Sequence, residues 1–520
     1  MIRSLTLDTE CKGEAMKKRT PNLHIIVLVL ILLLFTGCSA FIGRYGPPFY
    51  SGQDHHYFER LIYSSQTQLD DGFSYRLAAD DELRVVGAEA AAKDQALKAP
   101  LLLRFAWFSD VQIRQREVKL FSDEASLELD TIISSFEHNF VQEDFDWAVY
   151  LSLIAATNRL HQEKPLDFMI HTGDAIDAGT IEELYQFIHI SDRLKMPWLN
   201  LAGNHDVAIF GNYQERVSYT RQAGVNFYPV GNVDNFVWMH RKERKIAGFG
   251  RHLLPTPSEF GHSPSEDTGA DKKLPPTFHH GFDLSLDQGC GEFPPKNLDY
   301  EAVTGYYAAD LCQTEIPLRL IAMNTAKTME WGADAHVDSE QRTWLQKALL
   351  PRGQGLNLVF SHHRPQGFDA QTKQVLNSSG LAPVIVFTGH THQHHLARHE
   401  GLNGQGYYEL NTGSVLEYPQ IGRLIELRGS PQGPVWLVSR ALWNSLMPVG
   451  DMPTQSEVET VLTECLDQRE AKRANMAKAV QCGHLGALED YRSNAEQAWG
   501  RPQPFSEGWK NANVIVPIRR

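Results

Sequence analysis

The sequence has no hydrophobic run long enough to cross a lipid bilayer. Its longest, Ile25–Phe35, holds eleven apolar residues, whereas a spanning helix needs about 20. The run follows the basic residues Lys17, Lys18 and Arg19, and a basic segment before a short apolar one is typical of a secretory signal peptide. The sequence therefore predicts an exported protein rather than one that spans a membrane.

The residues at the end of this run, Phe35-Thr36-Gly37-Cys38, resemble the lipobox of bacterial lipoproteins, in which the cysteine is lipidated and becomes the mature N-terminus. Phe35 departs from the usual Leu, and an ordinary cleaved signal with a chance cysteine is the alternative. Acidic residues precede Met16 where basic ones should dominate, so we expect a start at Met16 and a signal peptide ending at residue 37. Ser39 is similar to the outer-membrane sorting pattern of these lipoproteins, which implies an envelope protein anchored through Cys38 and facing the periplasm.

Positive charge is also scarce. Lys and Arg number 49 against 63 Asp and Glu, which gives a formal net charge of −14. Because an acidic surface repels nucleic-acid backbones, a DNA or RNA polymer is not expected as a partner. Small phosphorylated substrates remain compatible with this charge if metal cations neutralise them locally. The 42% hydrophobic and 22% charged residues are those of a folded globular protein.

The chain contains only six cysteines. Cys11 precedes the expected start and Cys38 takes the lipid, so four remain in an oxidising compartment: Cys290, Cys312, Cys465 and Cys482. Local pairing, Cys290–Cys312 and Cys465–Cys482, is the simplest of three connectivities, and free buried thiols are the other alternative. Each local bridge would close a loop of about twenty residues and contribute about 3 kcal/mol.

Changes in composition divide the rest of the chain. Residues 38–99 are mixed and indicate a tether and a small N-terminal elaboration. Residues 100–430 alternate apolar runs with helical patterns and form the expected main domain. Within it, the segment 207–316 is rich in Gly, Pro, Asp and His in its middle and shows little periodicity, which is typical of a long loop or cap. Residues 431–520 are predicted to form a mostly helical extension.

Five apolar runs of the main domain end in polar residues. They are Leu101–Phe108, Asp167–His171, Pro197–Ala202, Leu356–Phe360 and Val384–Phe387, and each is typical of a buried strand. Helical patterns at 148–160, 181–194 and 338–349 lie between them, so the sequence predicts an α/β fold. Because ligands of such folds bind at the carboxyl ends of the strands, we expect these polar ends to converge on a site.

The polar residues at the strand ends are of kinds that bind metal ions. The set comprises Asp110, Asp174, Asn204, His362, His390 and His392. Carboxylate, carboxamide and imidazole donors without thiolates suit Mn, Fe or Zn, and differ from the ligands of a structural zinc site. One carboxylate shared by two cations holds them about 3.5–4 Å apart, and such a pair makes a hydroxide nucleophile near neutral pH. The sequence therefore predicts a site with two metal ions.

Five ordered motifs resemble those of the calcineurin-like metallophosphoesterases, which include purple acid phosphatases and cyclic-nucleotide phosphodiesterases. The motifs are Asp110-x-Gln112, Gly173-Asp174-x-x-Asp177, Gly203-Asn204-His205-Asp206, Val359-x-x-His362 and Gly389-His390-x-His392. The resemblance covers roughly residues 101–430. It implies a four-layer α/β/β/α sandwich of two mixed sheets, with a dinuclear metal site at the carboxyl ends of the strands. It also implies hydrolysis of phosphate monoesters or diesters.

Carried over residue by residue, the resemblance implies that Asp174 bridges both metals. The other ligands divide into a first-metal pair and a second-metal set: Asp110 and His392, then Asn204, His362 and His390. His205 would donate to the phosphate or protonate the leaving oxygen. Asp206 would hold the His205 imidazole in its orientation.

Gln112 departs from the family pattern, because most relatives with a second motif like this one carry His there. A Gln oxygen is a neutral ligand and a poorer partner than imidazole for Zn or Fe. Gln112 therefore either coordinates, directly or through water, or makes no metal contact, and the first metal site is expected to be weaker or biased toward Mn. Asp177 is interpreted as an outer carboxylate that orients a histidine.

Neighbouring residues leave further alternatives. His363 and Arg364 either touch substrate or lie at the surface, and His394 and His395 are expected on a solvated turn. The rival to an enzyme is a degenerate metal-binding scaffold of the same fold, of which Gln112 would be the first sign. The presence of every other ligand and of His205 favours the enzyme.

Overall fold

The structure, a computed structural model, describes residues 74–88, 91–114, 141–177, 183, 186–187, 190–191, 193–196, 198–207, 277–280, 306–311, 314–326, 333–401, 406–448, 453–467, 475–499 and 510–519. Cys38, Cys290 and Cys312 lie outside these residues, as does most of the segment 207–316. None of the helices in the described residues has the length and apolar character of a membrane span.

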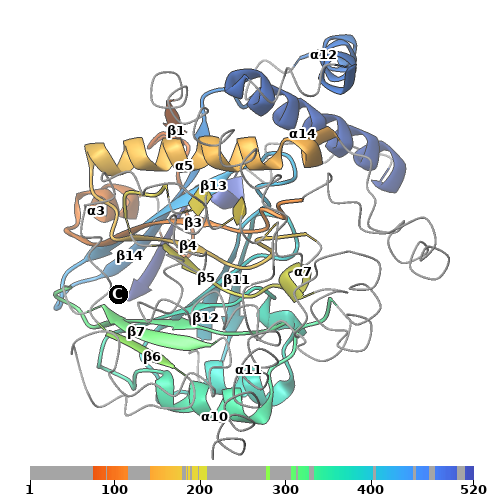
Figure 1. The fold of residues 1–520 in the computed structure, drawn as a ribbon. Helices are drawn as coiled ribbons and strands as arrows, with labels where there is room; N and C mark the ends of the chain where they lie inside the picture. Colours follow the sequence, from red (N-terminus) through yellow and green to blue (C-terminus); the bar gives the residue numbers. More distant parts are fainter. Residues whose placement is uncertain are drawn as a thin grey trace, which may run out of the picture. The chain divides into compact units, whose positions relative to one another are not determined.

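Two mixed sheets form the core (Figure 1). The first has eight strands, in the order β2 (Arg84–Val85), β15 (Val514–Arg519), β14 (Val435–Asn444), β13 (Gly422–Gly429), β3 (Leu101–Phe108), β4 (Phe168–His171) and β5 (Trp198–Asn200), with β1 (Tyr75–Leu77) paired to β14. Strands β3, β4 and β5 are parallel, whereas β13 runs antiparallel to β3. The three parallel strands are the first three apolar runs of the sequence, and their carboxyl ends therefore share one edge.

The second sheet has seven strands. Their order is β11 (His395–Glu400), β12 (Gly406–Asn411), β10 (Val384–Thr388), β9 (Leu356–Phe360), β8 (Leu318–Ala322), β7 (Tyr307–Leu311) and β6 (Thr277–His280). Strands β8, β9, β10 and β12 are mutually parallel. The described parts of the expected cap, β6 and β7, extend this sheet at its edge by antiparallel pairing.

Aromatic side chains join the inner faces of the two sheets. The Phe105 ring of β3 makes edge contacts with Phe360 of β9 and Phe387 of β10, with ring centroids 5.9 and 5.7 Å apart. Phe105 is fully buried. Aromatic pairs of this geometry stabilise a core beyond the burial of their area, so they fix the face-to-face position of the strands that carry the polar ends.

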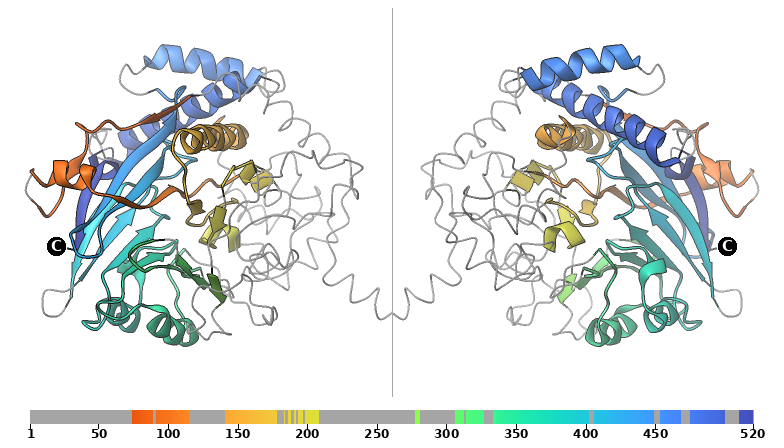
Figure 2. Two further views of the ribbon diagram at one scale, coloured as in Figure 1. Left: turned by 90° about the vertical axis from the view of Figure 1, so that its left-hand side faces the viewer. Right: turned by 90° about the vertical axis from the view of Figure 1, so that its right-hand side faces the viewer.

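Helices cover the outer faces of both sheets. The first sheet is covered by α3 (Ala92–Lys98), α5 (Asp146–Glu163) and, packed against α5, α14 (Met476–Trp499). The second carries α10 (Ser339–Ala348) and α11 (Ala370–Leu376), whose apolar residues share one core with strands β9 and β10. In both views of Figure 2 these two groups of helices lie on opposite sides of the strands. The α/β class and the two mixed sheets expected from the sequence are confirmed.

The start of α10 shows how the sequence sets a helix boundary. Asp338, directly before the helix, accepts a hydrogen bond from the backbone N–H of Gln341 at 2.7 Å. This side chain satisfies an amide that would otherwise lack an intrahelical partner. Asp338 and Gln341 are three positions apart, which is the spacing of a capping box.

The segment after residue 430 differs from the expected helical extension. Its first part, β14, and its last, β15, are strands of the first sheet, and β14 pairs with β13, β15 and β1. The helices α12 (Gln455–Asp467) and α14 lie between these strands in sequence. The main sheet is therefore incomplete without the C-terminal residues, because β14 is apolar along most of its length and is buried.

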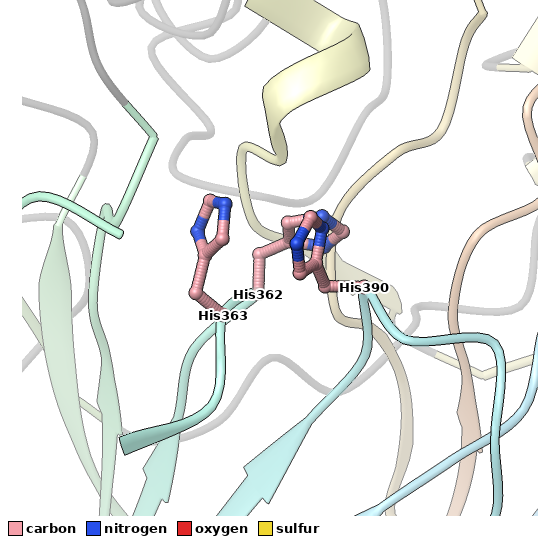
Figure 3. Close-up of side chains that lie close together, drawn as sticks. All are labelled: His362, His363 and His390. Carbon is pink, nitrogen blue, oxygen red and sulfur yellow. The ribbon is translucent and has the colours of Figure 1, made fainter. Parts of the chain in front are cut away.

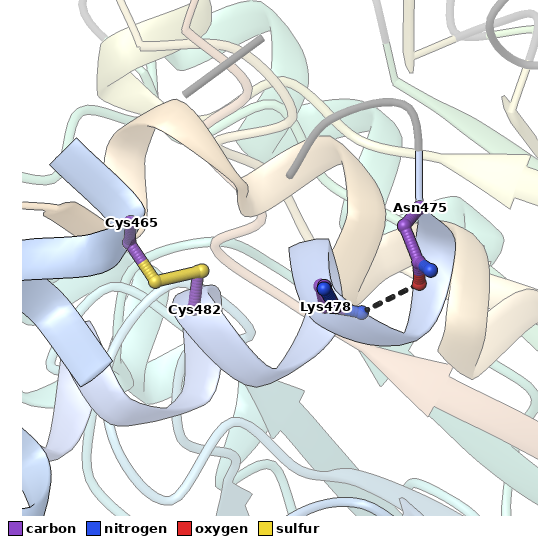
Figure 4. Close-up of a disulfide and its surroundings, with 4 residues drawn as sticks. All are labelled: Cys465, Asn475, Lys478 and Cys482. Carbon is purple, nitrogen blue, oxygen red and sulfur yellow. Dashed lines mark hydrogen bonds between the residues drawn. A yellow bond between two sulfur atoms is a disulfide. The ribbon is translucent and has the colours of Figure 1, made fainter. Parts of the chain in front are cut away.

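A disulfide between Cys465 and Cys482 joins α12 to α14 (Figure 4). One of the two predicted bridges is thus confirmed. At the start of α14, Asn475 accepts a hydrogen bond from the backbone N–H of Lys478 at 3.2 Å. The bridge closes a sequence separation of 17 residues, a loop for which a disulfide contributes about 3 kcal/mol in the chain-entropy treatment.

Candidate metal centre

The polar strand ends of both sheets meet at one site, as the sequence predicts. Asp110 lies two residues after β3 and Asp174 three residues after β4, while His362 and His390 each lie two residues after β9 and β10. Asn204 begins the short helix α7 (Asn204–Val207), which follows β5. Two sets of residues have donor atoms that lie within 4.8 Å of one another inside each set. They are Asp110, Asp174 and His362, and His362, His363 and His390.

The glycines of the motifs allow these loops to approach closely. A Cβ at Gly203 would collide with the backbone and carboxylate of Asp174, and one at Gly389 would collide with Ser109 and with the carboxylate of Asp110. Any larger residue would therefore displace a carboxylate from the site.

The backbone of the site is strained. Of the described residues other than glycine, six have positive φ, and five of them are site residues: Asp110, Gln112, Asp174, His390 and His392, with φ between 47° and 70°. Each such conformation costs of order 1–3 kcal/mol, and such residues concentrate at functional sites. The surrounding structure maintains these strained conformations, which direct the side chains toward one point.

Two buried carboxylates dominate the electrostatics. The side chains of Asp110 and Asp174 are 0% and 1% exposed. Asp110 accepts from the backbone N–H of His390 at 3.1 Å and lies 3.3 Å from His392 Nε2. Burial acts to raise the pKa of Asp110, but the charge and hydrogen bond of His392 together with the charge of His362 outweigh it, and the pKa is lowered. For Asp174 burial acts in the same direction, and the charges of His362 and His205 lower its pKa.

The His362 imidazole is held at both nitrogens. Nδ1 is 2.9 Å from the carbonyl oxygen of Thr172, and Nε2 is 2.9 Å from Asn204 Oδ1 and 3.2 Å from Asp174 Oδ2. Burial lowers the pKa of His362, yet the charge and hydrogen bond of Asp174 raise it to about 9. His362 Nε2 thus lies within 3.2 Å of two other donors expected at the second metal, Asn204 Oδ1 and Asp174 Oδ2.

Figure 3 shows three histidine rings from two adjacent strand ends, His362 and His363 after β9 and His390 after β10. The centroid of the His390 ring is 5.1 Å from that of His362 and 4.4 Å from that of His363. Burial, and next the charge of His362, lower the pKa of His390 to about 4. His390 is therefore a neutral imidazole, the form that binds metals.

Gln112 lies against the shared carboxylate. Its side-chain Nε2 is 3.3 Å from Asp174 Oδ2, and its backbone N–H donates to the Asp174 carbonyl at 2.9 Å. The residue is 5% exposed. The carboxamide is thus inside the cluster, where a half-turn about its last bond would present the oxygen in place of the nitrogen.

Asp177, not Asp206, contacts the His205 imidazole, which differs from the sequence expectation. His205 Nδ1 lies 3.1 Å from Asp177 Oδ1 and 2.9 Å from the Asp177 carbonyl oxygen. The His205 backbone N–H donates to Asp174 Oδ1 at 2.8 Å. Burial lowers the pKa of His205, but Asp174 and then Asp177 raise it to about 10. Arg114, 3.2 Å from Asp177, holds that carboxylate in turn.

Asp206 instead organises the backbone of the second motif. Its carboxylate accepts hydrogen bonds from four main-chain N–H groups, those of Asp174, Ala175, Ile176 and Gly203, at 2.8–3.1 Å. These bonds fix the strained turn at Asp174. Burial, and next the charge of Asp174, raise the pKa of Asp206 to about 7, although the backbone hydrogen bonds favour its charged form and act to lower it.

Two supports of the first strand end come from the loop after β12 and escaped the sequence interpretation. Glu417 Oε1 lies 2.7 Å from Nδ1 of His392, whose Nε2 faces Asp110. Ser414 Oγ donates to the Asp110 carbonyl at 2.6 Å. Neither belongs to a motif, and the sequence between His392 and Glu417 carries no periodic signal that links them.

The remaining candidates are more buried than expected. His363 is 2% exposed, and its Nδ1 lies 2.9 Å from Thr325 Oγ1. Arg364 Nε donates to the buried carboxylate of Glu409 at 2.5 Å. His394 is 5% exposed rather than solvated, and its Nδ1 accepts the backbone N–H of Gly413 at 3.1 Å. None of these three residues forms an exposed surface.

The donor set fits cations. Two carboxylates that are fully buried need compensating positive charge, and the imidazoles and the carboxamide around them are ligands of Mn, Fe and Zn. The arrangement at the carboxyl ends of the strands defines a metal-dependent hydrolase of the two-sheet α/β class.

Residues 103–394, more than half of the 520-residue chain, match the calcineurin-like phosphoesterase family. The chain belongs to this family, whose members use a dinuclear divalent metal centre, and it is a metal-dependent phosphoester hydrolase. A comparison with curated proteins found no match.

Several solved structures are similar to this chain at low identity. A dimetal phosphatase from Danio rerio is 12% identical, with 66% of this chain and 98% of that chain covered and a TM-score of 0.33. The purple acid phosphatase PPD1 from yellow lupin is 12% identical, with coverage of 66% and 54% and a TM-score of 0.32. The sulfate thiohydrolase SoxB of Thermus thermophilus is 11% identical, with coverage of 71% and 61% and a TM-score of 0.30.

Proposed function

We propose that the chain hydrolyses phosphate monoesters or diesters with two metal ions held by the strand-end residues. Asp174 would bridge the ions. The first ion would take Asp110, His392 and the Gln112 oxygen, and the second Asn204, His362 and His390. Support comes from the contacts between members of each set: His392 with Asp110, and His362 with both Asn204 and Asp174.

Bound metal ions would supply an activated water and neutralise the charge of the phosphoryl group. The protein's own part is to position a proton donor beside them. Asp177 engages Nδ1 of His205, which places Nε2 on the opposite side of the ring. In this proposal Nε2 donates to the phosphoryl group or to the leaving oxygen, and Asp177 stabilises the imidazolium form.

One observation carries the preference for an enzyme over a scaffold. Asp174 contacts His362 through Oδ2 and the backbone of His205 through Oδ1. A single carboxylate therefore couples the ligand cluster to the proton donor. A scaffold that merely binds metal has no need of an acid held beside its ligands, in a turn that costs strain.

Removing His205 and removing Asn204 should have different effects. His205→Ala should keep the metals and lose about 10²–10⁴ in kcat, the usual contribution of a general acid. Asn204→Ala should lower metal content and turnover together. Metal content and hydrolysis of p-nitrophenyl phosphate and bis-p-nitrophenyl phosphate, measured on the same preparations, separate the two.

The matched control is His395→Ala, which removes a histidine of β11 and should leave kcat unchanged. Phenyl phosphate adds a second comparison, because its poorer leaving group needs protonation more and should make the His205→Ala defect larger. Metal loss from His205→Ala, or an equal defect with both leaving groups, would show that His205 is not the acid.

The loop after β12 generates a further prediction. Because Glu417 holds His392 through Nδ1, Glu417→Ala should weaken metal binding at the first site by roughly 10–100-fold, the usual cost of losing such an outer carboxylate. Glu417→Gln should lose less, since a carboxamide oxygen still accepts the hydrogen bond. Competition for Mn²⁺ with a fluorescent chelator measures both, and unchanged affinity in Glu417→Ala would remove Glu417 from the site.

We further propose that the enzyme is anchored in the cell envelope through lipid on Cys38 and faces the periplasm. The proposal rests on the basic segment, the short apolar run and the lipobox-like residues before Cys38. A disulfide at Cys465 and Cys482 agrees with an oxidising compartment.

Cys38→Ala should release the protein from membranes or block its maturation. The measurement is membrane fractionation followed by activity assays of both fractions, with Cys465→Ser as the control for loss of a cysteine elsewhere. Membrane association of Cys38→Ala equal to that of the unaltered protein would refute the anchor.

A further inference from the structure

A cavity of about 690 Å³ lies far from the metal centre. It is lined by the turn before β9, the region between α11 and β10, the pairing partners β11 and β12, and the end of β15: among others Arg352, Leu381, Val384, Arg398, Tyr407 and Arg519. Val384 begins β10 and His390 follows its other end, so the two sites are about 20 Å apart at the usual rise of a strand.

The charge of this cavity is opposite to that of the chain. Three arginines line it, Arg352, Arg398 and Arg519, and no acidic residue is among its described lining. The chain as a whole carries −14. A concave site with charge of one sign concentrates ligands of the other sign, and three guanidinium groups favour oxyanions.

The Arg519 guanidinium makes no ion pair with an acidic side chain among the described residues, and its partners are backbone carbonyl groups. It donates to the carbonyl oxygens of Ser430, Pro431 and Gly433, in the turn between β13 and β14, at 2.6, 2.8 and 3.0 Å. Carbonyl groups orient the side chain but carry no net charge. The positive charge is thus held in place before any ligand binds, which lowers the entropic cost of binding.

The other two arginines differ in their freedom. Arg398 donates to the Tyr408 hydroxyl at 3.2 Å and pairs with Glu400 at 2.8 Å, at the solvent-exposed side of β11. The exposed Arg352 side chain makes no hydrogen bond or ion pair within the described part of the chain. Because Glu400 neutralises one of the three arginines, the cavity keeps two net positive charges among the described residues.

The rest of the lining is uncharged and mixes polar residues, Asn377 and Ser378, with apolar and aromatic ones. Leu376, Leu381, Val384 and Tyr407 are among its residues. A volume of about 690 Å³ is within the usual range for sites of small molecules, roughly 300–1,000 Å³. An inorganic ion alone would leave most of this space without contact.

We propose that this cavity is a second ligand site, which binds an oxyanion with an apolar body, such as an aromatic or aliphatic phosphate or carboxylate. The three arginines of the lining hold the acidic group, and Leu381 with the uncharged residues around it contacts the organic body. The site is separate from the metal centre and needs no metal ion.

The test uses the metal-loaded protein and the probe 8-anilinonaphthalene-1-sulfonate, which combines an aromatic body with an oxyanion. Binding is followed by dye fluorescence in the unaltered protein, Arg352→Glu and the double variant Arg352→Glu/Arg398→Gln. Lys373→Glu is the matched control, because it makes the same charge change as Arg352→Glu on α11 without lining the cavity.

Arg352→Glu should raise the dissociation constant roughly tenfold, the effect of losing one charge-assisted hydrogen bond, and the double variant should raise it further. Lys373→Glu should not change it. Displacement of the dye by phenylphosphonate but not benzoate would identify a phosphate site, and the reverse a carboxylate site. Hydrolysis of p-nitrophenyl phosphate should be unchanged in all variants, which also shows that they fold.

Two results would overturn the proposal. One is a dissociation constant of the dye that is the same in the double variant as in the unaltered protein. The other is competition between the dye and p-nitrophenyl phosphate, which would place the dye at the metal centre.

Discussion

The structure of the site depends on two buried carboxylates, Asp110 and Asp174, which require compensating positive charge. Without water around them, their charge is costly unless cations or hydrogen-bond donors surround it. Each carboxylate is contacted by an imidazole and by a backbone N–H of a neighbouring loop. The carboxylates raise the pKa of these imidazoles, which favours their positively charged form. Divalent cations would compensate the negative charge of the carboxylates more strongly. The need for positive charge therefore explains the ligands, the glycines and the close approach of the loops.

Rigid surroundings make this concentration of charge possible. The phenylalanines between β3, β9 and β10 hold the two sheets face to face, and the strained backbone at the strand ends then turns the side chains inward. Asp206 contributes by fixing the turn at Asp174 with four backbone hydrogen bonds. The free energy gained from packing and hydrogen bonding thus offsets the cost of the strained backbone conformations at the site.

Much of this was predictable from the sequence, because each strand of the centre is a short apolar run that ends in a candidate ligand, and parallel strands bring such ends together. Contacts between loops were not predictable. Asp206 is adjacent to His205 in sequence, yet α7 directs it to the backbone at Asp174, while Asp177 reaches the imidazole. Glu417 contacts His392 across a loop without a pattern. Residues 431–520 were expected to be mostly helical, whereas the apolar segment β14 that precedes α12 and α14 is a strand of the first sheet.

The central claim is that Asp174 joins two metal ions at this site. Metal content per chain, measured by inductively coupled plasma mass spectrometry after equilibration with Mn²⁺, tests it most directly in the unaltered protein, Asp174→Asn and Asp110→Asn. The account predicts two ions in the unaltered protein, loss of one in Asp110→Asn, and loss of both in Asp174→Asn. Two ions retained in Asp174→Asn, or no more than one in the unaltered protein, would contradict it.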